Sequence, residues 1–320
     1  MTIFTDIREG CRQVADAASF ARIDRARLEQ YARDFPVTEL GKATLDPATH
    51  YVGRGKDTLL FVLALDTINF GSGYFPHIKK RAGMSGYFTV AAGLNDWFKA
   101  EGPPSAERLE SLTRADCARI FGQVEGDAVA LELMGLFAGA LKDLGALLLA
   151  RFGGEATRLV ETARHKAANL IRILRQMPYF DDVAIWRGRA VPFMKRAQLT
   201  AADLNLAFAG EGWGRFDDLH DLTIFADNLV PHVLRVDGVL SYDPALLARV
   251  SAGEVLKAGS PEEVEIRAAA LHAVEVLKGH LRAAGHNRIT SMALDYLLWN
   301  RGQADRYKAA PRHRARCVFY

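Results

Sequence analysis

The sequence predicts a mainly α protein, a compact orthogonal bundle of helices, and three observations lead to this class. Apolar residues recur at intervals of three and four over long stretches, which is typical of helices with one buried face. Prolines and turn residues separate these stretches. Capping residues and acids stand where several stretches begin, as the helix dipole favours.

The elements can be followed along the chain. Helical spacing predicts helices in the segments 3–34, 113–121, 126–152, 155–177, 193–208, 261–284 and 291–299, with one more capped helix near Asp243-Pro244. Residues 58–70 are nearly all apolar, and periodicity does not decide between a buried strand and a buried helix.

A chain of 320 residues is long enough to bury a large core. We expect a single domain over residues 1–320, with two closely packed helical lobes, 1–100 and 101–320, as the alternative. Charges interrupt the N-terminal segment, and the apolar run 139–150 contains Lys142 and Asp143 and is short for a membrane span. We therefore expect a cytoplasmic protein without a membrane partner.

Charge and motifs narrow the function classes. Lys and Arg number 41 and Asp and Glu 38, so the net charge of +3 is small for a protein that binds duplex phosphate, and we expect no stable nucleic-acid complex. The motifs GxGxxG, GxxxxGK[ST], GxSxG and HExxH do not occur. Glu161 and His165 are four apart, but a lone pair of this kind is more typical of a surface contact than of a metal site. The sequence predicts neither a metal nor a cofactor.

The stretch 225–234, FADNLVPHVL, sets an acid among apolar residues. A carboxylate beside a buried layer needs hydrogen-bond partners or a shifted pKa. Asp227 has a structural interpretation, as the cap of a helix with Pro231 in its first turn, and a functional one, as the acid of an active site.

Other polar residues also lie inside apolar stretches. Asp295 and Trp299 are four apart and would share one face of a helix. Lys195 lies in PFMKRAQL, and His313 and Arg314 lie in the C-terminal segment PRHRARCVFY. Each can be an ordinary solvated or capping residue. Taken together they indicate a polar pocket in a helical core.

Several short motifs, in order, resemble the queuosine salvage protein family. They are DTINFGSGYFP (66–76), PYF (178–180) with the acids 181 and 182 after it, FMKRAQLTAADL (193–204), FADNLVPHVL (225–234) and PRHRARCVFY (311–320). The resemblance extends from about residue 50 to the end. It implies hydrolysis of the N-glycosidic bond of queuosine 5′-phosphate, with release of the base queuine, and a fold similar to helix-hairpin-helix DNA glycosylases.

The resemblance also implies roles for individual residues. Asp227 takes the position of the catalytic acid. The residues expected around the base are His50, Phe225, Asn228, Asp295 and Trp299. The residues expected around the 5′-phosphate are Lys195, His313 and Arg314. Small molecules, the nucleotide and queuine, are the expected partners.

The sequence departs from the family's pattern at several positions. Many members have Tyr-Arg after the acid and Gln after the proline, where this chain has Asn228-Leu229 and His232. An Arg often follows the PYF-like motif, where Asp181 stands here. The absence of these arginines affects how the 5′-phosphate could be bound, and it does not affect the expected catalytic acid, Asp227. Two other functions remain open: a base-flipping DNA glycosylase, which would need a broad basic face, and a helical interaction module without activity.

Overall fold

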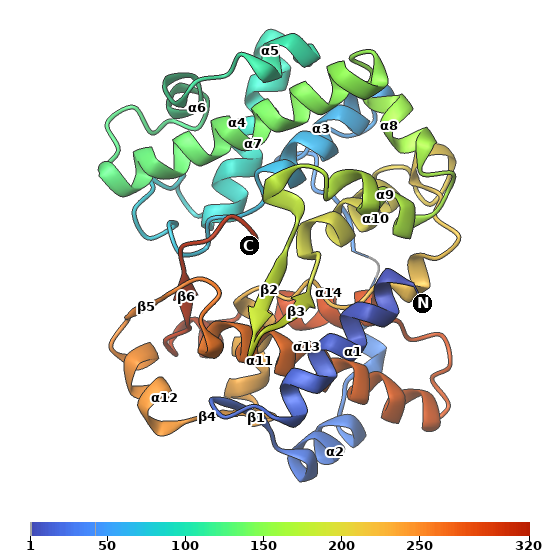
Figure 1. The fold of residues 1–320 in the computed structure, drawn as a ribbon, viewed down its shortest axis with the longest axis vertical. Helices are drawn as coiled ribbons and strands as arrows, with labels where there is room; N and C mark the ends of the chain where they lie inside the picture. Colours follow the sequence, from blue (N-terminus) through green and yellow to red (C-terminus); the bar gives the residue numbers. More distant parts are fainter. Residues whose placement is uncertain (1, 42) are drawn as a thin grey trace. The chain divides into compact units, whose positions relative to one another are not determined.

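The protein is described by a computed structural model that covers residues 2–41 and 43–320 (Figure 1). The chain divides into two compact units that interleave in sequence. Unit 1 comprises Met1–Ala43, Asp182–Lys195 and His220–Arg316. Unit 2 comprises Thr44–Asp181, Arg196–Leu219 and Cys317–Tyr320.

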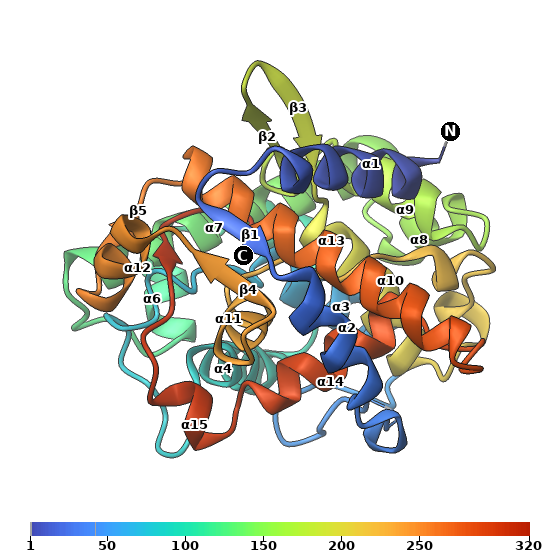
Figure 2. The same ribbon diagram turned by 90° about the horizontal axis from the view of Figure 1, so that it is seen from below.

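Unit 1 is built around the long helix α13 (Pro261–Ala283). Ser260 caps its first turn by accepting a hydrogen bond from the Glu263 N–H, and Pro261 occupies the first helical position, where a missing N–H costs nothing. Helix α1 (Ile3–Asp16) packs along α13, and Figure 2 shows the two side by side. The other helices of this unit are α2 (Arg25–Arg33), α11 (Leu229–Val236), α12 (Pro244–Ser251), α14 (Ser291–Arg301) and α15 (Asp305–Lys308).

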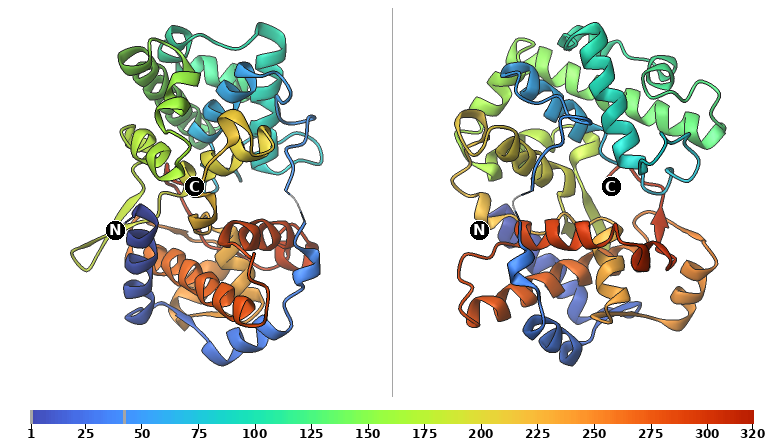
Figure 3. Two further views of the ribbon diagram at one scale, coloured as in Figure 1. Left: turned by 90° about the vertical axis from the view of Figure 1, so that its right-hand side faces the viewer. Right: turned by 180° about the vertical axis from the view of Figure 1, so that it is seen from behind.

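Unit 1 also contains three sheets of two strands each. Strand β1 (Ala21–Ile23) pairs antiparallel with β4 (Leu240–Tyr242), with Arg22 opposite Ser241. Strands β2 (Val183–Trp186) and β3 (Arg189–Pro192) form a hairpin beside α1 (Figures 2 and 3). Strand β5 (Val255–Leu256) pairs in parallel with β6 (Arg314–Ala315).

The predicted all-helical bundle is therefore wrong. About 57% of the chain is helical, and the small sheets make the content mixed. The likeness to helix-hairpin-helix DNA glycosylases, which the resemblance implied, is not retained. The strands were missed because each has two to four residues, too few for an alternating pattern to stand out against the helices around it.

Unit 2 has the 25-residue helix α7 (Ala128–Phe152) at its centre. Gly145 lets this helix approach α5 closely, because a Cβ at that position would lie 2.5 Å from both the Ala106 carbonyl oxygen and the Glu110 amide nitrogen. By length and composition α7 could cross a membrane, yet half of its most apolar window is buried inside the protein, which also fits a core helix. The other helices are α3 (Lys56–Thr67), α4 (Gly86–Glu101), α5 (Ala106–Glu110), α6 (Arg114–Ile120), α8 (Ala156–Thr162), α9 (Ala167–Leu174) and α10 (Lys195–Ala207), whose first residue belongs to unit 1.

The structure decides one segment that the sequence left open and corrects one predicted helix. Residues 58–70, which fitted a strand or a helix, belong mainly to α3. The helix predicted over 155–177 is divided into α8 and α9, because Arg164 and His165 adopt left-handed backbone conformations with φ of 51° and 55°.

Candidate active site

Asp227 stands at the start of α11 and is half-buried. Its Oδ1 accepts hydrogen bonds from the Leu229 N–H at 2.8 Å and the Val230 N–H at 3.2 Å. Asp227 thus supplies the capping oxygen of α11 from the position before the N-cap residue, Asn228, whose own side chain forms no capping bond, and Pro231 lies in the first turn. Within residues 2–41 and 43–320, the hydrogen bonds of this side chain engage Oδ1 alone. The cap fixes the carboxylate on the backbone and leaves its second oxygen for another partner.

Asp295 connects α14 with the segment that precedes α11. Its Oδ1 accepts a hydrogen bond from the Phe225 N–H at 2.9 Å, and both residues are buried. The ring of Phe225 meets the ring of Tyr296 edge to face, with their centroids 6.1 Å apart. Consecutive residues of α14 thus hold the backbone and the ring of Phe225.

The pKa of the Asp295 carboxyl depends on the charges of two other predicted residues, Asp227 and Lys195. Burial raises the pKa of the Asp295 carboxyl well above its ordinary value, and the negative charge of Asp227 adds to this effect. The Phe225 N–H and the charge of Lys195 act in the opposite direction. Asp295 therefore favours the protonated form beside an acid, Asp227, that has a free oxygen. Carboxyl pairs with different environments recur in enzymes that need an acid and a base together.

Lys195 is buried and begins α10. Its backbone N–H donates to Asp182 Oδ2 at 3.1 Å. Asp182 also forms a two-pronged ion pair with Arg267 of α13, with distances of 3.0 and 2.7 Å. The backbone at the start of α10 is therefore anchored on a buried ion pair.

The C-terminal segment meets the start of α11. The Asn228 Nδ2 donates to the His313 carbonyl oxygen at 3.3 Å. The His313 side chain is buried, and neither ring nitrogen has a hydrogen-bond partner among the described residues. Burial, and then the nearby positive charges, lower the pKa of His313 to about 3, so its ring is neutral. A buried ring with two unsatisfied nitrogens is costly without a ligand, because each buried polar atom has given up its bonds to water.

Trp299 and Arg314 have weaker links to this cluster. Trp299 is half-buried on α14, one turn after Asp295, but Tyr296 and not Trp299 meets the Phe225 ring. Arg314 lies on β6, where it pairs with Val255. Its charge acts on the neighbouring Arg312, whose pKa is lowered by burial.

His50 lies in unit 2, whereas the other eight predicted residues lie in unit 1. It is buried, its Nε2 is 3.1 Å from the Tyr87 hydroxyl, and its Nδ1 is 3.0 Å from the Thr49 hydroxyl. Burial lowers the pKa of His50. These bonds hold its ring within unit 2, and its role toward the base stays a prediction.

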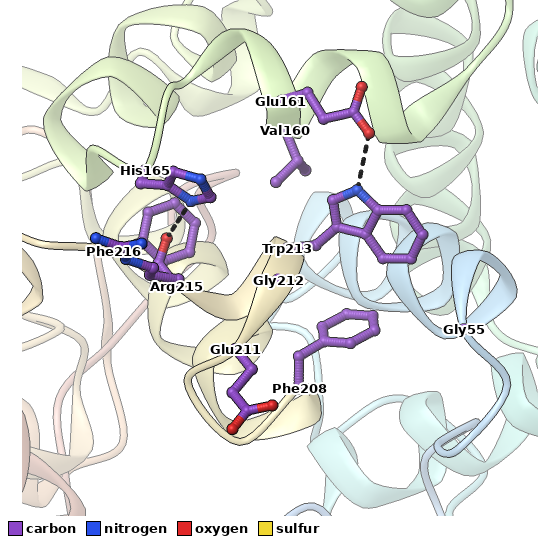
Figure 4. Close-up of a pocket in the computed structure, with 10 residues that line it drawn as sticks. All are labelled: Gly55, Val160, Glu161, His165, Phe208, Glu211, Gly212, Trp213, Arg215 and Phe216. Atoms are coloured by element: carbon purple, nitrogen blue, oxygen red, sulfur yellow. Dashed lines mark hydrogen bonds between the residues drawn. The ribbon is translucent and has the colours of Figure 1, made fainter.

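Unit 2 also contains a cavity of about 780 Å³ that none of the predicted residues lines (Figure 4). Trp213 donates its indole N–H to Glu161 at 3.0 Å and meets the Phe208 ring edge to face at 5.7 Å. The His165 ring lies 3.2 Å from the Arg215 carbonyl oxygen. Glu161 and His165 thus have separate partners, and among the described residues no group of three His, Cys, Asp or Glu could hold a metal.

The family model of the queuosine salvage protein matches residues 49–320.

The chain belongs to the queuosine salvage protein family.

Three relatives carry the name queuosine 5′-phosphate N-glycosylase/hydrolase. The chain is 38% identical to the protein of Sphaerobacter thermophilus over 97% of this chain and 96% of that one. It is 30% identical to the Mus musculus protein over 98% of both chains, and 29% identical to the Dictyostelium discoideum protein over 100% of both. The chain is thus similar to these three relatives over nearly their whole length.

Several residues of this site escaped the sequence reasoning. Tyr296 was missed beside the more conspicuous Trp299, and Arg312 beside His313, although the charge of Asp227 acts on Arg312. Arg267 gave one usable signal, a positive charge at the start of an apolar run of α13, two residues after Glu265. Its partner Asp182 lies 85 residues away in sequence, and only the fold brings the two together.

Proposed function

We propose that this protein hydrolyses the N-glycosidic bond of queuosine 5′-phosphate and releases queuine and ribose 5-phosphate. The observation that carries the proposal is the 38% identity, over 97% of the chain, with a protein named for this activity. The cluster of Asp227, Asp295, Lys195 and Phe225 in unit 1 offers suitable chemistry for it.

Asp227 is the residue that acts on the sugar. As the base departs, positive charge develops on the ribose, and a carboxylate beside the anomeric carbon stabilises it. The helix cap engages Oδ1, so Oδ2 is the oxygen that faces the sugar or the attacking water. General-base help is worth about 10²–10⁴-fold, and electrostatic stabilisation supplies much of the remainder.

The negative charge that develops on the departing base must also be stabilised. A 7-deazapurine has no N7 lone pair, so protonation at that position cannot assist its departure. Asp295, in the protonated form that its burial favours, donates a hydrogen bond or a proton to the leaving base. Phe225, together with Trp299 and Asn228 of the same unit, lies against the base, and base–aromatic stacking contributes about 1–3 kcal/mol per base.

The reaction balances without a cofactor. The carbon–nitrogen bond breaks and its electron pair leaves on the base. A water oxygen bonds to the anomeric carbon, and Asp227 takes one proton from that water. Asp295 supplies a proton to the base and regains one from solvent, while Asp227 loses its proton there.

Cations must neutralise the 5′-phosphate. Lys195 is the first candidate cation and Arg314 the second. The neutral His313 ring adds no charge, but its N–H can donate a hydrogen bond to a phosphate oxygen. A bound phosphate oxygen would accept a hydrogen bond from His313 and remove the cost of burying its unsatisfied ring.

A direct assay tests the proposal. Purified protein is incubated with queuosine 5′-phosphate and, separately, with queuosine, and the products are separated by chromatography. We expect queuine from the nucleotide, and the comparison with queuosine measures the contribution of the phosphate. Absence of queuine from both substrates would reject the proposal in favour of an interaction module.

A further inference from the structure

Arg267 contacts the backbone directly beside the predicted catalytic acid. It is 2% exposed in the middle of α13. Its Nε donates to the Ala226 carbonyl oxygen at 3.0 Å, and Ala226 is the residue before Asp227. The guanidinium therefore fixes the chain on one side of Asp227, while the helix cap fixes it on the other.

The two remaining nitrogens of the same guanidinium bind Asp182, and Nη1 also lies 3.6 Å from Oε1 of the buried Glu263. Nη1 donates to Oδ1 at 3.0 Å and Nη2 to Oδ2 at 2.7 Å, the parallel fork geometry that only arginine offers to a carboxylate. The guanidinium also lies over the Phe193 ring, with Cζ 4.0 Å from the centroid.

Asp182 extends this link to Lys195. Its Oδ2 accepts the Lys195 N–H at 3.1 Å, and its own carbonyl oxygen accepts the Phe193 N–H at 2.9 Å. A chain of hydrogen bonds therefore runs from Ala226 through Arg267 and Asp182 to Lys195. It joins the backbone beside the predicted catalytic acid to the backbone of the predicted phosphate ligand.

We infer that Arg267 and Asp182 form a positioning pair that sets the distance between Asp227 and Lys195. This inference rests on the proposed function, since it assigns a task within that active site. Neither residue reacts. The pair holds the acid and the phosphate ligand in register, so that phosphate binding places the anomeric carbon against Asp227. A misplacement of about 1 Å in such an arrangement can cost about 10²-fold in rate.

A purely structural role for the pair predicts a different effect on turnover. Loss of a buried ion pair lowers stability wherever it occurs, and activity then falls only as far as the folded fraction falls. A positioning role lowers the turnover of the folded protein itself. The two roles separate when kcat is measured well below the melting temperature of each variant.

The test uses Arg267→Lys, which keeps the charge but loses the fork and the bond to Ala226. The matched control is Glu265→Gln, two residues away on α13 and equally buried. Glu265 accepts hydrogen bonds from the Ser19 and Phe20 amides and the Trp186 indole, outside the proposed site. We expect both variants to melt earlier than the wild type. Only Arg267→Lys should lose kcat on queuosine 5′-phosphate, by about 10²-fold, with a smaller change in KM.

Asp182→Asn is the second variant, because it weakens the link at its other end: an amide nitrogen, which cannot accept a hydrogen bond, replaces one carboxylate oxygen. We expect it to lower the preference for queuosine 5′-phosphate over queuosine, since Lys195 would be released. A kcat for Arg267→Lys within threefold of the Glu265→Gln value overturns the positioning role while wild-type turnover stands. Failure of both Arg267→Lys and Asp182→Asn to fold also overturns it, because the pair would then serve folding. An inactive wild-type protein would instead reject the proposed function.

Discussion

A carboxylate has two oxygens and can serve a helix and a reaction at once. Asp227 gives Oδ1 to the first turn of α11, so the capping and catalytic interpretations of this residue are compatible. The helix holds the side chain in one orientation, and an active site needs such preorganisation.

Asp227→Asn separates the two tasks. The amide oxygen of Asn can still accept the Leu229 and Val230 N–H groups, so we expect the fold and the binding of queuine to persist. The lost charge should reduce release of queuine by at least about 10²–10⁴-fold. Chromatography of the products measures the release. Asp243→Asn is the control, because Asp243 caps α12 through the N–H groups of the residues two and three places after it, Ala245 and Leu246, as Asp227 does in α11. Turnover like that of the wild type in Asp227→Asn would remove Asp227 from the mechanism.

The raised pKa of Asp295 has a consequence for stability. The folded state holds this proton more tightly than the unfolded chain does, so its contribution to the free energy of unfolding falls as pH rises through the raised pKa. Asp295→Asn removes the titration and keeps an acceptor for the Phe225 N–H. We expect the variant to gain stability relative to the wild type as pH rises from about 4 to 8. Denaturant unfolding at several pH values measures this, and a difference that does not vary with pH would show that the carboxyl is not perturbed.

At the scale of elements, the site depends on how α11 and α14 meet. Gly302, at the end of α14, touches the first residue of α11, and a Cβ there would lie 2.8 Å from Leu229 Cγ and Cδ1. This close contact fixes the position of Leu229, the first residue of α11, and Asp227 accepts hydrogen bonds from Leu229 and from the next residue.

Gly302→Ala should therefore disturb the site through its packing. We expect a lower melting temperature and reduced turnover, because Leu229 and the cap beside it must shift. Gly279→Ala on α13 is the control, since a Cβ there meets nothing within 4 Å and Ala favours a helix by about 1 kcal/mol. That control should stabilise the protein and leave turnover unchanged. Equal turnover in the two variants would contradict the role of this contact.

At the scale of the whole molecule, the small net charge and the family membership agree on a small-molecule enzyme. The two other possible functions differ in the ligand that the protein should bind. An interaction module without activity should not bind queuine, and a base-flipping DNA glycosylase should bind duplex DNA.

Queuine should stabilise the whole protein against heat. A ligand that binds only the folded state adds about 2.7 kcal/mol at 100 times its Kd, which raises Tm by a few degrees. We expect this rise with queuine, and no shift of duplex DNA in a gel at 0.15 M salt, where a glycosylase with a basic face would bind. Differential scanning calorimetry measures the first and a gel-shift assay the second. An unchanged Tm at saturating queuine would favour an interaction module.

Local patterns in the chain were enough to predict most of the helices and to single out Asp227, and the short motifs indicated the family. Short motifs, caps and helical periodicity are local, so they can be read from neighbouring residues, as at Asp227 and in α6, where the predicted cap Thr113 forms a capping box with Asp116. Three features became known only from the fold: the six short strands within residues 2–41 and 43–320, the helical state of most of residues 58–70, and the ion pair of Arg267 with Asp182. Strand pairing and buried ion pairs join residues far apart in the chain, and their energy comes from burial that no single segment provides.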